Sequence, residues 1–296
     1  MVASSNFAEL LWPGLAEIWG DSYNDWDALY SKIFQIKKSS KRFEKEQGVT
    51  GLGLAGLKDE GASIGYDDPF QGAQKEYVMT TYALGVNITR ELADDEMYDY
   101  INSIPKKLAR SMRQTEETLA FNHLNNGSTA AFVGADGLTL FNASHTLVGG
   151  GTYRNQLAAA ADLSQTSLEQ TLQDIMDWVD DRGLKINAKG VTLVVPTQVN
   201  FRARKILGTE KVTGGNDNDM NPLNGALKLV VSPFLTDNDC CFVITDIDNG
   251  LVWYNRRDAE IVRDNEFDTQ NMKIATTRRF SSGWTDPRGA FSLLGA

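Results

Sequence analysis

The side chains that most often carry out chemistry are scarce in this sequence. Its 296 residues include two histidines, His123 and His145, and two adjacent cysteines, Cys240 and Cys241. Neighbouring residues on a strand point to opposite faces, which is poor geometry for a disulfide, so we expect both cysteines to be buried strand residues. With no Cys-x-x-Cys pair and so few imidazoles, the sequence does not predict a zinc site.

Hydrolytic catalysis would need a nucleophile next to a general base, and Ser144 with His145 is the candidate pair. No Gly-x-Ser-x-Gly elbow accompanies this pair. Adjacent carboxylates lie in strongly polar stretches where nothing would raise their pKa values, so solvated surface explains them. These pairs are Asp67-Asp68, Asp94-Asp95 and Asp180-Asp181. We therefore predict no catalytic residues and no enzyme activity, with the Ser144 hydrolase as the competing hypothesis.

Two glycine-rich or acidic motifs could suggest a ligand. The stretch Gly51-Leu-Gly53-Leu-Ala-Gly56 has the spacing of a dinucleotide-binding turn, but a charged segment precedes it and a segment broken by Gly61, Gly65 and Pro69 follows it. The turn needs a buried strand before it and a helix after it, so we predict no cofactor and interpret the glycines as a flexible loop. Asn216-Asp-Asn-Asp219 lacks the calcium-binding loop pattern, so turn chemistry is the main interpretation and a weak divalent-ion site the alternative.

Composition excludes several classes of protein. Lys and Arg number 29 against 39 Asp and Glu, a net charge of −10, and 42% of residues are hydrophobic. An acidic chain cannot hold nucleic acid through clustered positive charge, so any nucleic acid nearby would be enclosed without specific binding. No apolar run approaches the roughly 18 residues of a membrane span, and the N-terminus has no basic signal region, so we expect a protein that stays in the cytoplasm where it is made.

The first ninety residues predict an arm followed by a projecting hairpin. Trp12, Trp19 and Trp26 have helical spacing, but Pro13-Gly14 and Gly20 interrupt it. We therefore expect short helical pieces in an arm that packs on something else, with a helix of the domain's own core as the alternative. A charged stretch, a glycine-rich stretch with few large apolar residues, and a strand-like stretch at 76–89 then predict a long hairpin around a glycine-rich tip.

The rest of the chain predicts a mixture of helices and strands. A helical block begins at Thr89 and ends near His123, and we place Pro105 in the first turn of a second piece, which gives one kinked helix or two in succession. Helices from about 164 and from 197 to 207 alternate with strands at 191–195, 227–231 and 240–247, which indicates an α/β subdomain. Asn249-Gly250 predicts a hairpin between the last of these strands and the next.

This order of elements resembles the major capsid proteins of tailed double-stranded DNA phages. Short sequence motifs along nearly the whole chain carry the resemblance. They are Ile64-Gly-Tyr-Asp67, Tyr82-Ala-Leu-Gly-Val-Asn-Ile-Thr-Arg-Glu-Leu92, Gly134-Ala-Asp-Gly137, Leu140-Phe-Asn-Ala-Ser-His145, Gly149-Gly-Gly-Thr152, Val194-Val-Pro196, Asn216-Asp-Asn218 and Phe280-Ser-Ser-Gly-Trp284. The order and spacing of these motifs are more specific to the family than any single motif.

The resemblance implies an α+β fold, the tailed-phage major capsid fold, with a long spine helix, a projecting β-hairpin called the E-loop and an α/β axial domain. The implied segments are an N-terminal arm (1–41), the E-loop (42–87), a peripheral domain with the spine helix (88–162), an axial domain (163–248) and closing strands that return to the peripheral domain (249–296). An arm and a loop too poor in apolar residues to fold alone can be ordered by neighbouring subunits.

The implied function is a structural head protein that self-assembles as hexamers and pentamers into an icosahedral shell around double-stranded DNA, in a virion built in the bacterial host cytoplasm. An encapsulin-like nanocompartment shell is the alternative. Partners of the scaffolding, portal and decoration kinds are compatible with the resemblance, and scaffolding would be a separate protein or absent because the arm begins near Met1. In some relatives an E-loop lysine forms an isopeptide bond, for which Lys58 and Lys75 are the donors to test.

Subunit contacts are expected from apolar residues with no local core. These residues are Trp12, Trp19, Trp26, Leu52, Leu54 and Leu57.

Overall fold

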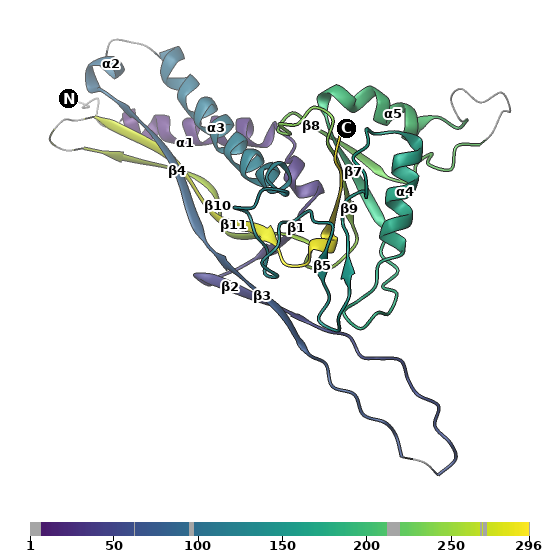
Figure 1. Cartoon of the computed structure of the whole chain (residues 1–296). Coiled ribbons are helices and arrows are strands. Elements are labelled where there is room, and N and C mark those ends of the chain that lie inside the picture. Colours follow the sequence, from purple (N-terminus) through teal and green to yellow (C-terminus); the bar gives the residue numbers. More distant parts are fainter. Residues whose placement is uncertain are drawn as a thin grey trace.

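Two four-stranded sheets and a projecting hairpin organise the chain, as the computed structural model in Figure 1 shows. The structure describes residues 7–61, 63–94, 98–211, 220–266, 268 and 271–295. The elements of the first half are α1 (Phe7–Asn24), η2 (Leu29–Lys32), β1 (Gln35–Lys38), β2 (Phe43–Val49), β3 (Gln71–Val78), β4 (Thr80–Ile88), α2 (Arg90–Asp94), α3 (Tyr98–Asn125), β5 (His145–Thr146) and β6 (Thr152–Tyr153). Those of the second half are α4 (Gln165–Met176), β7 (Gly190–Pro196), η3 (Thr197–Val199), α5 (Asn200–Gly208), β8 (Lys228–Ser232), β9 (Cys241–Thr245), β10 (Leu251–Asn265), β11 (Met272–Trp284), η4 (Pro287–Gly289) and β12 (Ala290–Leu293). This mixture is an α+β fold, as the sequence predicted.

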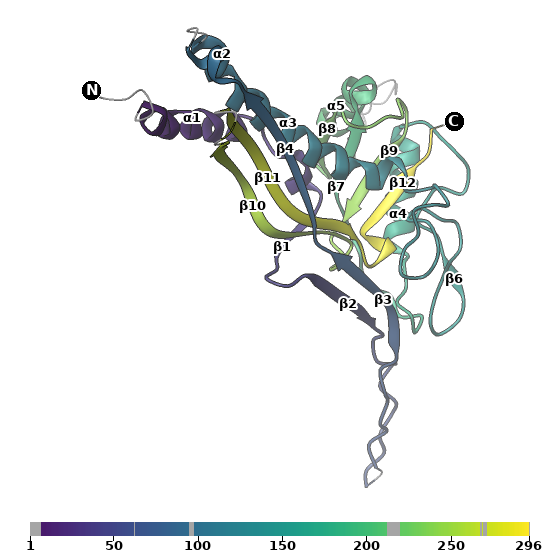
Figure 2. The same ribbon diagram turned by 90° about the vertical axis from the view of Figure 1, so that its left-hand side faces the viewer.

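The first sheet has the strand order β1-β10-β11-β4, with β1 parallel to β10 and the other pairs antiparallel. Helices α1 and α3 pack on it, and Figure 2 shows the sheet and helices above the hairpin, which projects downward. Leu15 and Trp19 of α1 meet Leu108 of α3 and Ile274 of β11 in one buried cluster. The apolar stripe of α3 therefore faces the N-terminal helix as well as the sheet.

The second sheet has the order β12-β9-β7-β8 and separates two cores. Along β7, Val194 lies in the core shared with the first sheet, whereas Leu193 and Val195 lie in the core under α4 and α5. Cys240 and Cys241, at the start of β9, likewise face opposite cores, and both are free and buried. The sequence prediction for the two cysteines is thus confirmed, because side chains alternate along a strand.

The N-terminal helix corrects one expectation. We expected Pro13 and Gly14 to divide the arm into short pieces, but α1 is one helix with Pro13 inside it. A proline within a helix removes a hydrogen bond and costs about 3 kcal/mol. Leu15 and Trp19 are 3% and 8% exposed, so their burial against α3 offsets that cost. The alternative interpretation, a helix of the domain's own core, describes this segment.

Three further expectations are wrong in detail. Pro105 lies inside α3, which begins at Tyr98, and not in a first helical turn. The strand expected at 76–89 is two strands in different sheets, because β3 pairs with β2 whereas β4 pairs with β11. Asn249, at a φ of 59°, does turn the chain, but β9 and β10 belong to different sheets and form no hairpin.

The closing segment also divides between the sheets. Strands β10 and β11 form a long antiparallel pair in the first sheet. The last strand, β12, pairs with β9 in the second sheet instead. The segment after residue 249 therefore contributes strands to both four-stranded sheets.

Candidate functional site

The candidate catalytic histidine is held in a structural role. His145 is fully buried, with Nδ1 2.7 Å from Asp136 Oδ2 and Nε2 3.2 Å from the Leu140 carbonyl oxygen. Its ring stacks on Tyr153 at 5.1 Å between centroids. Both ring nitrogens are therefore occupied within the chain, and no contact joins them to Ser144, so this arrangement does not supply a general base to that hydroxyl.

The second histidine is also part of the packing. His123 Nε2 lies 2.9 Å from Ser282 Oγ, and burial, with a further effect from Lys75, lowers the pKa of His123 to about 4.

Among the described residues, no group of three or more His, Cys, Asp or Glu side chains is placed to hold a metal ion. The Asn216–Asp219 cluster lies outside the described residues. No helix in the described part of the chain has both the length and the apolar character needed to cross a membrane.

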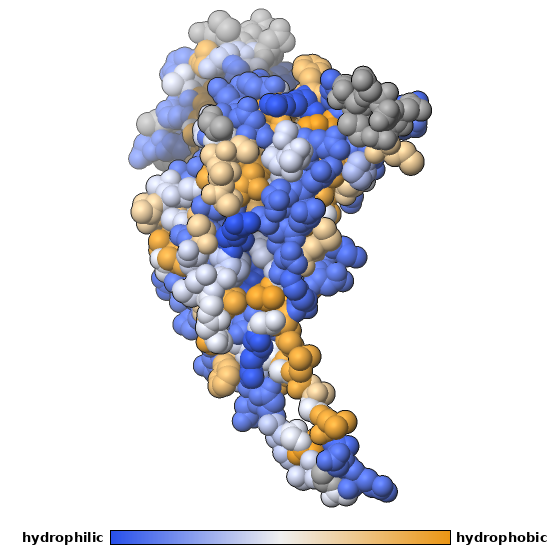
Figure 3. Space-filling view, turned by 45° about the vertical axis from the view of Figure 1, so that its right-hand side comes forward, coloured by the Kyte–Doolittle hydropathy of each residue, from blue (hydrophilic) through white to orange (hydrophobic). Residues whose placement is uncertain are grey.

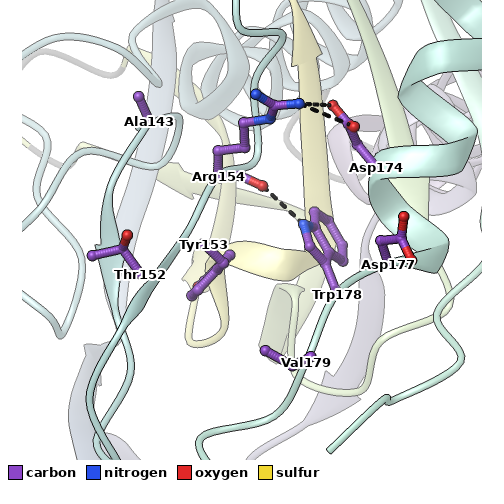
Figure 4. Close-up of a pocket in the computed structure, with 8 residues that line it drawn as sticks. All are labelled: Ala143, Thr152, Tyr153, Arg154, Asp174, Asp177, Trp178 and Val179. Carbon is purple, nitrogen blue, oxygen red and sulfur yellow. Dashed lines mark hydrogen bonds and ion pairs between the residues drawn. The ribbon is translucent and has the colours of Figure 1, made fainter. Parts of the chain in front are cut away.

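A hollow of about 400 Å³ lies between the β6 region and the end of α4. Figure 4 shows that its polar groups satisfy one another: Arg154 pairs with Asp174 at 3.0 Å, and Trp178 Nε1 donates to the Arg154 carbonyl at 2.8 Å. Asp177, on the rim, pairs with Lys185 at 2.7 Å. Both carboxylates that line this hollow are therefore paired, and its geometry is that of a surface dip between packed elements.

The E-loop is the feature that the fold leaves without a core. Strands β2 and β3 pair from Phe43↔Val78 to Val49↔Gln71, and beyond this ladder the residues 50–70 form what we call the E-loop tip. Its large apolar side chains are strongly exposed, and Figure 3 shows groups of hydrophobic atoms along one side of the projection. Their exposed fractions are Leu52 56%, Leu54 84%, Leu57 97%, Ile64 64% and Tyr66 94%. Several exposed apolar side chains gathered on one projecting segment are typical of an interaction site.

The three tryptophans expected as contacts differ in exposure. Trp19 is 8% exposed and stacks on Tyr23 at 5.1 Å, so its own chain covers it. Trp12 is half-buried beneath the Arg263 guanidinium, 5.2 Å from the ring centre. Trp26 is 38% exposed beneath Arg110 at 5.3 Å. We expected subunit contacts from apolar residues that have no local core. Trp19 has a local core, so this reason does not apply to it.

A polar cluster holds the base of the E-loop. Glu46 of β2 accepts hydrogen bonds from Lys37 of β1, from Tyr254 of β10 and, at 2.7 Å, from Thr285. Tyr77 of β3 lies 2.6 Å from the same Thr285 hydroxyl. Burial alone would raise the pKa of Glu46, but the hydrogen bonds lower it below the ordinary value. Both strands of the hairpin are thus fixed to the first sheet by one carboxylate and its donors.

A second buried network, which the sequence analysis missed, holds the N-terminal arm. Glu116 of α3 accepts from the Tyr23 hydroxyl at 2.7 Å and from Arg113 at 3.0 Å, and it also pairs with Arg278 of β11. Arg113 is itself buried, at 6% exposure. The available signal was the position of Glu116 on the apolar stripe, four residues from both Met112 and Ala120.

The neighbouring Glu117 holds the start of η2. Its carboxylate accepts the backbone N–H groups of Leu29 at 2.7 Å and Tyr30 at 3.1 Å. Burial raises the pKa of Glu117 to about 7, partly opposed by these hydrogen bonds and by Arg113. The arm is therefore attached to the spine helix by charged groups that are out of water.

Comparison with known proteins agrees with this architecture. The model of the family "phage capsid protein" matches residues 72–293, well over half of the chain. No curated protein matches the chain by sequence. Among solved structures, the chain is similar to the capsid of a native GTA particle, with 14% identity, a TM-score of 0.61 and coverage of 91% of this chain and 90% of that chain.

Two further solved structures share the fold. The chain is similar to a structure of Mycobacterium phage Patience, with 10% identity, a TM-score of 0.59 and coverage of 97% and 88% of the two chains. It is also similar to the capsid of bacteriophage JBD30 decorated with minor capsid protein trimers, with 13% identity, a TM-score of 0.57 and coverage of 71% and 92%. The matching family favours a phage shell over a nanocompartment shell. The chain has the tailed-phage major capsid fold and belongs to the phage capsid protein family, as a structural shell protein of the virion.

Proposed function

We propose that copies of this chain form hexamers and pentamers that close into an icosahedral head around double-stranded DNA, assembled in the cytoplasm of a bacterial host. The observation that carries this proposal is the E-loop, which projects from the subunit and exposes apolar side chains that its own fold cannot bury. Family membership and fold support the same conclusion. The subunit has no enzymatic role in this proposal, because its histidines serve the packing.

The proposed subunit contacts are Leu52, Leu54 and Leu57 of the E-loop tip, together with Trp12 and Trp26 of the arm. Complete burial of a leucine side chain against a neighbour contributes about 1.5–3 kcal/mol, so three leucines favour association substantially. Trp19 is not in this set because α3 already covers it. Each subunit would present its tip to a second copy, an arrangement that closes into rings when repeated by rotation.

The enclosed DNA would be held without specific binding. The net charge of −10 disfavours tight contact between the shell and the phosphates of packaged DNA. Scaffolding, portal and decoration proteins complete the set of proposed partners. Their contacts would lie outside the E-loop tip, which this proposal assigns to the shell's own copies.

Electron microscopy with light scattering tests the proposal. The parent chain, expressed alone and with its neighbouring genes, should give uniform shells, and DNA-filled particles from infected cells should contain it as the main protein. Leu54→Asp should raise the protein concentration needed for assembly more than tenfold, because it removes an apolar contact and places a carboxylate in it. Ser63→Asp adds the same charge to the same tip without removing an apolar side chain and serves as the matched control.

Two outcomes would contradict the proposal. Normal shells from Leu54→Asp would show that the tip leucines are not subunit contacts. Small oligomers only, from the parent chain together with its neighbouring genes, would contradict the shell itself. Circular dichroism of the unassembled Leu54→Asp subunit separates a loss of assembly from a loss of folding, and we expect an unchanged spectrum because Leu54 is 84% exposed.

A further inference from the structure

A tight turn between α4 and β7 reaches out to the E-loop tip. In this turn, Asp180 Oδ1 accepts the backbone N–H groups of Arg182 at 2.8 Å and Leu184 at 2.9 Å. The chain reverses at Gly183, with a φ of 81°, and the Asp180 N–H donates to the Leu184 carbonyl at 2.7 Å. This segment, which we call the 180–184 turn, is therefore held by its own backbone and carboxylate, a rigid base for the side chain at its end.

The turn is also fixed to the body of the subunit. The Gly149 N–H donates to the Asp181 carbonyl at 2.9 Å, and a Cβ at residue 149 would lie only 2.2 Å from that oxygen. The Asp181 carboxylate is 3.5 Å from the Arg288 guanidinium, which is mostly buried. The position of Arg182 is thus set by contacts that do not involve the E-loop.

Arg182 contacts the E-loop tip with three parts of its guanidinium. Nη1 lies 3.1 Å from Asp67 Oδ1, Nη2 donates to the Asp68 carbonyl, and the planar group lies 4.8 Å from the ring centre of Phe70. The other oxygen of Asp67 accepts the Gly53 N–H at 2.7 Å, so one carboxylate joins Arg182 to both arms of the tip. A planar guanidinium can make these paired and stacked contacts together, which a lysine cannot.

Glycines allow the close approach of the first arm. A Cβ at residue 51 would lie 2.9 Å from Asp180 Oδ2, and one at residue 53 would lie 3.3 Å from Asp67 Oδ2. These positions belong to the Gly51–Gly56 motif whose spacing resembles a cofactor-binding turn. A side chain at Gly51 would press on the 180–184 turn, and one at Gly53 would press on Asp67 of the opposite arm, so close packing explains these two glycines without a cofactor.

We propose that Arg182 is a positioning residue for assembly: it holds the E-loop tip in one direction relative to the second sheet before a second copy of the chain binds. The β2–β3 ladder ends at Val49 and Gln71, and the Thr50 N–H adds one further bond to the Phe70 carbonyl at 2.9 Å. Beyond that point the described residues of the tip form no strand that would fix its direction. A contact surface that is already oriented loses less conformational freedom on binding, which favours association. This inference rests on the proposed function, since it assigns the tip leucines to contacts with a second copy.

Distances between spin labels in the unassembled full-length subunit test the positioning directly. Labels at Ser63→Cys on the tip and Thr166→Cys on α4 report the direction of the tip, and the native cysteines are buried, at 4% and 0% exposure. The parent should give one narrow distance distribution. Arg182→Ala should broaden it severalfold, and Arg182→Lys should give an intermediate width.

Two companion variants make the result specific. Asp67→Asn weakens the same contact from the tip side without altering the 180–184 turn, and it should also broaden the distribution. Arg154→Ala breaks an ion pair to Asp174 away from the E-loop and should leave the distribution unchanged. A distribution as narrow in Arg182→Ala and Asp67→Asn as in the parent would overturn the inference.

Assembly kinetics give the second measurement. Arg182→Ala should lengthen the lag before shells appear and lower the fraction of uniform particles severalfold, with the folded content of the subunit unchanged. A broadened distribution together with parental assembly kinetics would overturn the positioning role. Normal assembly of Leu54→Asp would instead refute the proposed contacts of the tip, and that result is independent of the label distances.

Discussion

Replacing Glu117 with glutamine should change how the stability of the unassembled subunit depends on pH. Burial raises the pKa of Glu117 from 4.5 to about 7 in the folded subunit. In the unfolded chain the carboxyl loses its proton near pH 4.5, so between these values the folded state binds more protons. The free energy of unfolding therefore falls as pH rises from about 4.5 to about 7. The stabilisation that the bound proton gives, relative to high pH, is fully present only below about pH 4.5.

The size of this effect follows from the two pKa values. Each unit of difference corresponds to about 1.4 kcal/mol, so the change from 4.5 to about 7 lowers the free energy of unfolding by about 3 kcal/mol. Glu117→Gln keeps a carbonyl oxygen that can accept one of the two N–H groups at Leu29 and Tyr30, but it cannot ionise. The variant should be close to the parent in stability near pH 4.5 and more stable than the parent near pH 8.

Urea unfolding followed by tryptophan fluorescence, at constant ionic strength from about pH 4.5 to about pH 8, measures this difference. Glu17→Gln is the matched control, because it makes the same chemical change at an exposed position on α1. A difference in unfolding free energy between Glu117→Gln and the parent that stays constant within about 0.5 kcal/mol over this range would refute the reasoning. It would mean that the Glu117 carboxyl is charged in the folded subunit at every pH tested.

Two further predictions concern the packing of the subunit. Trp253 is fully buried and stacked between Tyr30 at 4.4 Å and Phe280 at 4.2 Å, so Trp253→Ala should lower the free energy of unfolding by about 3–5 kcal/mol, as measured by urea denaturation. Gly250 approaches Gly289 so closely that a Cβ at residue 250 would lie 2.5 Å from the Gly289 Cα, and Gly250→Ala should lower the thermal midpoint of unfolding by several degrees. An unchanged urea midpoint in the first variant, or an unchanged melting temperature in the second, would contradict the packing described.

Elements with local signals were predictable from the sequence. Ser164 was a candidate start of a helix, and it does cap α4 in a reciprocal pair with Ser167. The alternation of β7 and the opposite faces of the two cysteines follow from the two-residue period of a strand. These predictions needed only residues within one element, which is why they were confirmed.

The failures involve partners that are far apart in the sequence. Asn249-Gly250 has the composition of a hairpin turn, but the strands on either side join different sheets because each finds a better partner elsewhere. The partners of Glu116, Tyr23 and Arg278, are likewise distant from it along the chain. No local pattern encodes these pairings, so they could be found only once the fold brought the residues together.

The E-loop combines polar attachment with exposed apolar surface. Its base is attached by Glu46 and its tip by Arg182. Charged contacts fix the direction of a segment through geometry while leaving its apolar side chains uncovered. Had the tip been attached through Leu54 and Leu57, those side chains would be buried in the subunit and unavailable to a neighbour. Polar attachment of the E-loop is therefore compatible with the exposure of these two residues, at 84% and 97%, and it leaves them free for the contacts with a second copy that we propose.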